Sequence, residues 1–243
     1  MGKLKHLGSA LSRMHTAKGF GVHSPFAFNF IKNVLDEEYG YYCYDHLQQL
    51  RLAVTERTQA VQGYKPRVIS ISEAAALFRV ANYYNPPLFL SIGTSYGVAA
   101  ASLLTVSHRS RAVIYDPAVT DNNAACELLA GYKSRITDHD KLQDAIAEYE
   151  KLLAAEDSAA CRFVAINNLA DSDAPAATAL IDSMVQKEGV LVLRNICSSR
   201  PMTALWQRCK EQMSYGMTFT NEKMAVIILS PKLPRQDFAI WLS

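Results

Sequence analysis

A glycine turn in the middle of the chain is the first feature that could bind a ligand. Residues 88–92 are a short apolar run after Asn85-Pro86-Pro87, which predicts a buried strand. Gly93-Thr94-Ser95-Tyr96-Gly97 comes next, and the small and apolar residues 98–106 predict a buried helix. Such a junction points backbone N–H groups and the positive end of a helix dipole at one place, where an anionic or hydroxyl-rich ligand can bind. An ordinary α/β turn is the alternative.

Asp116 is the most suggestive acid. It ends a second predicted strand, Arg111 to Tyr115, about twenty residues after the glycine turn, where a carboxylate commonly accepts both hydroxyls of a ribose. Pro117 keeps Asp116 out of the helical region. A solvated turn aspartate is the competing interpretation. Neither G-x-G-x-x-G nor a phosphate-binding P-loop is present, which disfavours an NAD-type dehydrogenase.

Further polar residues follow other predicted strands, where ligands bind in a doubly wound sheet. They are Asn167-Asn168, Arg194-Asn195 and the Asp138-His139-Asp140 segment. His139 and His23 are the candidate general bases, because the ordinary pKa of histidine lies near neutrality. His23 also fits a structural role before a helix that Ser24 caps and Pro25 begins.

Composition excludes several classes of protein. The 243 residues are 49% hydrophobic and 20% charged, with a net charge of +2 and scattered basic residues, so we expect no nucleic-acid or membrane partner. The five cysteines and six histidines show no metal-ligand spacing, and we expect no metal. The first residues lack the apolar region of a signal peptide, which predicts a cytoplasmic protein.

The remaining pattern predicts an α/β protein with a Rossmann-like, doubly wound, mostly parallel sheet of seven strands. A helical extension is expected over 1–66 and the sheet domain over 67–243. The extension contains tyrosines at 41, 42 and 44 that could cover a ligand or, as we favour, pack against the sheet domain. Ser70 to Glu73 has capping-box spacing and opens a helix to Tyr84.

The elements after the glycine turn are expected as alternating strands and helices. The expected helices are 122–132, 141–155, 174–187 and 201–213, the expected strands are 134–137, 161–166 and 189–193, and Met217–Thr220 with Met224–Leu229 would form a C-terminal antiparallel hairpin.

Together these features resemble the class I S-adenosylmethionine-dependent methyltransferase fold. The segments GFGVHSPFAF, LFRVANYYNPPLFLSIGTSYG and MTALWQRCK are similar to small bacterial proteins of the O-methyltransferase type. The resemblance runs over nearly the whole chain from about residue 18. It implies cofactor contacts at the glycine turn, the ribose-binding acid and two strand ends: Ser91, Gly93, Thr94, Ser95, Gly97, Asp116 and Asn167.

The resemblance also reveals departures. The family places an acid where this chain has Ser91, and carboxylates where it has Asn167, Arg194 and Asn195. Magnesium-dependent relatives need those carboxylates as oxygen ligands. Two functions stay open: a metal-independent methyltransferase of an unknown small acceptor, or a catalytically inactive methyltransferase-fold protein that serves as a binding or scaffold module, as a homodimer or with a partner protein.

Overall fold

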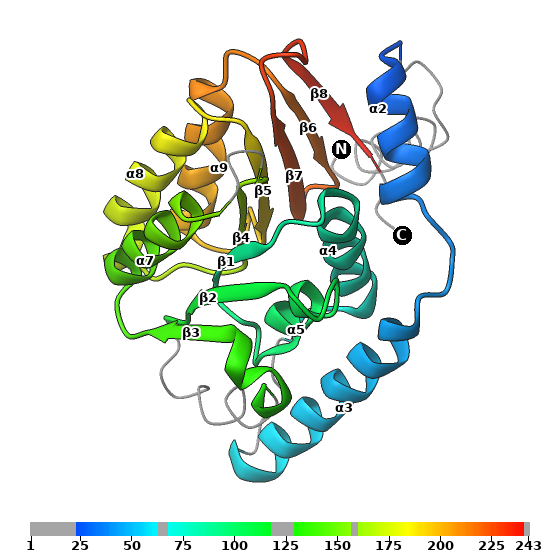
Figure 1. Cartoon of the computed structure of the whole chain (residues 1–243), viewed down its shortest axis with the longest axis vertical. Coiled ribbons are helices and arrows are strands. Elements are labelled where there is room, and N and C mark those ends of the chain that lie inside the picture. Colours follow the sequence, from blue (N-terminus) through cyan, green and yellow to red (C-terminus); the bar gives the residue numbers. More distant parts are fainter. Residues whose placement is uncertain (1–22, 63–67, 118–128, 157–159, 241–243) are drawn as a thin grey trace, which may run out of the picture.

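The computed structural model describes residues 23–62, 68–117, 129–156 and 160–240, which form one twisted sheet with helices on both faces (Figure 1). The strands are β1 Leu88–Ile92, β2 Arg111–Tyr115, β3 Ile136–His139, β4 Phe163–Ile166, β5 Gly189–Arg194, β6 Met217–Thr220, β7 Met224–Leu229 and β8 Gln236–Ala239. The helices are α2 Pro25–Phe30, α3 Tyr42–Gln62, α4 Ile71–Tyr84, α5 Val98–Leu104, α7 Leu142–Ala154, α8 Ala174–Met184 and α9 Arg200–Gln212. Shorter turns are the π-helical η1 Ile31–Leu35 and the 3₁₀ turns η3 Ala130–Arg135 and η4 Asp171–Asp173.

The strand order is β3-β2-β1-β4-β5-β7-β6-β8. The first five strands in this order are parallel, whereas β7 runs antiparallel to both β5 and β6. Because the chain continues from β1 to β2 on one side and reaches β4 only after β3, the topological switch point lies between β1 and β4. This confirms the predicted Rossmann-like architecture and the C-terminal hairpin.

The expectation of seven strands was wrong, because β8 adds an eighth at the edge beside β6. It pairs parallel to β6, and the Phe238 ring stacks on Phe219 at 5.2 Å. Residues 236–239 read QDFA, a polar segment without an apolar run, so periodicity could not reveal this strand. Only pairing with β6 makes it one.

The third strand begins two residues later than expected. The sequence predicted a helix over 122–132 and a strand over 134–137. The structure instead has the turn η3 followed directly by β3. Residues 122–128 of the expected helix lie outside the described residues. Arg135 explains the shift, since its Nη1 donates to the carbonyls of Leu104, Ser107 and Ser110 at 2.9, 2.7 and 3.1 Å. Those bonds hold residue 135 in the preceding turn.

The two faces of the sheet bury different side chains. One face packs Phe89, Phe163 and Val192 against α4 and α5, and the other packs Leu90, Val164 and Leu191 against α7, α8 and α9. All residues of β1, β4 and β5 are buried, as expected for strands covered on both sides.

The N-terminal helices share the core of the first face. Ser24 caps α2 as expected, accepting from Ala27 N at 3.3 Å, and Phe30 meets Phe219 of β6 at 5.1 Å. The division at residue 66 lies outside the described residues and stays a prediction.

The tyrosine-rich segment is divided between packing and exposure. The rings of Tyr41 and Tyr44 pack against Phe78 of α4, at 5.0 and 5.9 Å, whereas Tyr42 is exposed. Packing at 41 and 44 is therefore confirmed. The exposed Tyr42 is the first residue of the helix α3.

Gly216, the residue before β6, should not tolerate a side chain. Its φ is +90°, and an added Cβ would lie 2.3 Å from the carbonyl oxygen of Ile228. We expect Gly216→Ala to lower the free energy of unfolding by about 2 kcal/mol or more, measured by urea denaturation. Gly131→Ala is the control, because nothing lies within 4 Å of the added Cβ there. Equal stabilities for the two variants would contradict this prediction.

Candidate functional site

The carboxyl ends of four adjacent strands meet at the switch point. Ile92 of β1 is in register with Tyr115 of β2 and Ile166 of β4, and Ile166 is in register with Leu193 of β5. The next residue on each strand therefore lies in one row along this edge of the sheet. That row contains Asp116, Gly93, Asn167 and Arg194.

The glycine turn is wound around Thr94. The Thr94 backbone N–H donates to Oδ2 of Asp116 at 2.9 Å, and its hydroxyl donates to the same oxygen. The Gly97 N–H donates back to Thr94 Oγ1 at 3.2 Å. Asp116 is thus held beside the turn with its carboxylate in a fixed orientation, as a ribose-binding acid would require. The structure brings together the glycine turn and the acid that the sequence singled out.

The backbone of the turn is left-handed at four of its five residues, including two that are not glycine. The φ angles are 76° at Gly93, 51° at Ser95, 58° at Tyr96 and 89° at Gly97. Such conformations cost free energy at non-glycine residues and persist only where surrounding contacts hold them. One such contact is the hydrogen bond from Ile69 N to Ser95 Oγ, 2.8 Å long.

Gly93 makes room for a side chain of the protein itself. A Cβ on Gly93 would lie 1.6 Å from Oδ1 of Asn168. The group that approaches Gly93 most closely is therefore the side chain of Asn168. The helix that follows, α5, has seven residues and ends at Leu104, two residues before the expected end.

Asn167 connects the glycine turn to β5. Its Nδ2 donates to the carbonyl of Gly93 at 2.5 Å, and its Oδ1 accepts from Arg194 Nη1 at 3.4 Å. The side chain is almost fully buried. Asn195, with φ 55°, donates from Nδ2 to the Asn167 carbonyl at 2.9 Å. Both ends of the Asn167 amide thus have protein partners, which makes it a positioning residue.

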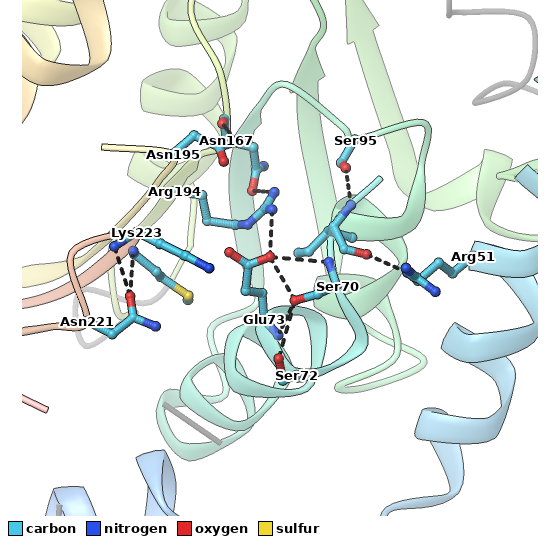
Figure 2. Close-up of polar contacts among 12 residues, drawn as sticks. Arg51, Ser70, Ser72, Glu73, Ser95, Asn167, Arg194, Asn195, Asn221 and Lys223 are labelled. Atoms are coloured by element: carbon cyan, nitrogen blue, oxygen red, sulfur yellow. Dashed lines mark hydrogen bonds and ion pairs between the residues drawn. The ribbon is translucent and has the colours of Figure 1, made fainter. Parts of the chain in front are cut away.

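A buried ion pair joins β5 to the first turn of α4 (Figure 2). Arg194 Nη2 donates to Glu73 Oε2 at 3.1 Å, and the side chains are 5% and 18% exposed. The same Glu73 oxygen accepts from the backbone N–H and the hydroxyl of Ser70 at 3.2 and 2.8 Å, which completes the predicted capping box. Sequence reasoning treated Glu73 only as a cap. No local signal could have revealed its partner, which is 121 residues away.

The pair changes the ionisation of both groups. Burial by itself raises the pKa of Glu73, but the charge of Arg194 and the hydrogen bonds from Ser70 and Arg194 outweigh it, so the pKa lies below its ordinary value. Burial lowers the pKa of Arg194, and Glu73 opposes that change. A guanidinium keeps its proton in proteins, so both partners are charged. The ends of β4 and β5, which have no acid of their own, thus lie beside a carboxylate from α4.

Two buried polar atoms near this pair have no hydrogen-bond partner among the described residues. They are Ser91 Oγ and Arg194 Nε. By strand alternation Ser91, Asn167 and Arg194 all lie on the α4 face of the sheet. A buried donor without a partner costs about 1–3 kcal/mol, so such atoms often mark places where another molecule binds.

The two histidines lie in different surroundings. His139 is the last residue of β3, in register with Tyr115, and its Nε2 is buried without a partner among the described residues. His23 is exposed before α2, which packs on β6, four strands along the sheet from β1. By strand alternation the His139 side chain shares the face of Tyr115, opposite the α4 face on which Asp116 lies, and His23 is not joined to the glycine turn either.

The described part of the chain has neither a metal-binding cluster nor a membrane-spanning helix. No group there of three or more His, Cys, Asp or Glu side chains could hold a metal ion. None of its helices has the length and apolar character needed to cross a membrane.

Solved structures that share this fold include O-methyltransferases in complex with SAM or SAH. The O-methyltransferase TomG from Streptomyces achromogenes, in complex with SAM, matches with a TM-score of 0.54 at 13% identity, over 75% of this chain and 90% of that one. The O-methyltransferase from Bacillus cereus, in complex with SAH, matches with a TM-score of 0.54 at 14% identity, over 81% and 96%. A methyltransferase from Geobacter sulfurreducens matches with a TM-score of 0.50 at 15% identity, over 82% of this chain and 97% of that one.

These likenesses show that the chain has the Rossmann-like methyltransferase fold. No protein-family model matches the sequence, and no curated protein matches it. At these identities only the fold carries over, and the chemistry must be argued from the residues of this chain.

Removing the charge of Glu73 should change the acid limb of the stability profile. Because its pKa is lowered on folding, the pair stabilises the protein fully above the unfolded value of 4.5, and this contribution is lost as the pH falls through the lower folded pKa. We expect Glu73→Gln to cost about 3 kcal/mol at pH 7, the low end for breaking a buried pair, and to flatten that acid dependence. Urea unfolding at pH 3 to 8 measures both.

Glu148→Gln is the matched control. Glu148 pairs with Lys151 on the surface of α7, at 3.2 Å, and exposed pairs contribute about 0–1 kcal/mol. A Glu73→Gln profile parallel to wild type at every pH would show that the buried pair does not govern acid stability.

Proposed function

We propose that this protein is a metal-independent, S-adenosylmethionine-dependent methyltransferase that acts on a small acceptor in the cytoplasm. The observation that carries the proposal is the carboxylate of Asp116, held by Thr94 beside the glycine turn at the switch point of the sheet. The SAM-bound and SAH-bound O-methyltransferases that share the fold support the choice of cofactor.

The residues present fit the nucleoside half of this cofactor. The oriented Asp116 carboxylate is an acceptor for the ribose hydroxyls, and Ser95 and Gly97 complete the turn that faces them. When bound, S-adenosylmethionine supplies an electrophilic methyl group on a positively charged sulfur. The protein then has to position an acceptor in line with that group and exclude water, which needs no metal.

His139 is the proposed general base. It ends β3 in register with Tyr115, the residue before Asp116, and its buried Nε2 has no hydrogen-bond partner among the described residues. His23 is the weaker candidate, because it stands before a helix that packs on β6. The proposal includes a homodimer.

One observation favours a second function, a non-catalytic methyltransferase-fold module. Asn167 and Arg194 are engaged with each other and with Gly93 and Glu73, at strand ends where catalytic carboxylates would otherwise stand. Such a module would bind partner proteins, or a second copy of itself, and would transfer no methyl group. Binding of S-adenosylmethionine separates the two functions.

Replacing Asp116 tests the methyltransferase proposal. We expect micromolar binding of S-adenosylmethionine and S-adenosylhomocysteine to the wild type by isothermal titration calorimetry. Asp116→Ala should weaken it by about 1–3 kcal/mol, the contribution of hydrogen bonds to a charged group. Glu211→Ala, which removes an exposed carboxylate on α9, should change nothing. No heat from the folded wild type at high ligand concentration would refute the proposal and favour the module.

A further inference from the structure

The Glu73–Arg194 pair is only half formed. A carboxylate and a guanidinium commonly make two parallel hydrogen bonds. Here one bond is made, from Nη2 to Oε2, and Arg194 Nε is buried without a partner among the described residues. Every hydrogen bond that Glu73 accepts from the described chain ends on the same oxygen, Oε2. The pair thus leaves a cationic donor at Nε and an anionic acceptor at Oε1.

The pair is connected to the glycine turn on two sides. On one side, Asn167 links Arg194 Nη1 to the carbonyl of Gly93. On the other, Ile69, which precedes the α4 cap, donates from its backbone N–H to Ser95 Oγ. The half-formed pair therefore joins the ends of β4 and β5 to the first turn of α4 (Figure 2).

We propose that Glu73 and Arg194 bind the α-amino-acid group of the cofactor, the ligand's carboxylate on Arg194 Nε and its ammonium on Glu73 Oε1. This inference rests on the proposed function. A group with both charges on one carbon meets both open atoms and buries no net charge, whereas a simple anion or cation would leave one partner uncompensated. It also completes the hydrogen bonding of a buried donor.

This assignment accounts for the neutral residue at the end of β1. Ser91 is fully buried and carries no charge to receive an ammonium group. Glu73 approaches the same face of the sheet from α4 and supplies that charge. Recognition of the amino-acid group thus moves from a strand to a helix, with Arg194 as the residue that holds Glu73 there.

The test compares two ligands, of which only one carries the charged amino-acid group. S-adenosylhomocysteine carries it, and 5′-methylthioadenosine keeps the adenosyl thioether without it. The variant is Glu73→Gln/Arg194→Met, which removes both charges together and so avoids leaving one buried and unpaired. The matched control is Asp182→Asn/Arg208→Met, which removes a bidentate pair between α8 and α9 on the opposite face, with bonds of 2.8 and 2.9 Å. Circular dichroism and thermal melting verify the fold of each.

In the wild type and the control, titration calorimetry should show S-adenosylhomocysteine binding at least tenfold tighter than 5′-methylthioadenosine. In the Glu73/Arg194 variant the affinities for the two ligands should differ by no more than about twofold, because only the affinity for S-adenosylhomocysteine is lost. An unchanged ratio, or tighter S-adenosylhomocysteine binding by the variant, would overturn this inference and leave the proposed function standing. No binding of either ligand by the wild type would overturn both.

Discussion

The buried guanidinium of Arg194 is the constraint on which the carboxyl edge of the sheet depends. A charge that is 4% exposed must have a partner in the protein, because leaving it unpaired would cost several kcal/mol. Glu73 supplies the opposite charge and Asn167 a neutral acceptor. These two contacts connect the first turn of α4 and the end of β4 to β5. The glycine turn is then held by Asn167 through the carbonyl of Gly93.

The N-terminal helices support this arrangement from outside. Arg51 of α3 donates to the carbonyl of Ile69 at 3.1 Å, and the backbone N–H of Ile69 donates to Ser95 Oγ in the glycine turn (Figure 2). Farther along α4, the buried Arg79 donates to the carbonyls of Val34 and Leu35, at 2.7 and 2.9 Å, at the end of η1. The described helices of residues 23–62 therefore help to hold α4, the helix that carries Glu73.

The chemistry of this edge differs from what the strand ends alone imply. The carboxyl ends of β1, β4 and β5 carry a serine, amides and an arginine, which by themselves suggest a pocket without acids. The folded chain places the Glu73 carboxylate among them, so this edge carries a positive and a negative charge, and the pair adds no net charge. That balance is compatible with a ligand that carries both charges, and it is unlike a magnesium site, which needs several hard anionic oxygens.

Local pattern was enough to predict β1, the glycine turn, Asp116 and the capping box at Ser70, because each depends on neighbours a few residues away. It also predicted the parallel order of the sheet, since alternating strands and helices permit few topologies. It missed β8, whose polar sequence becomes a strand only beside β6, and the role of Glu73. An ion pair between residues 121 positions apart leaves no periodic trace, so only the tertiary structure could decide that α4 shares the site with β5.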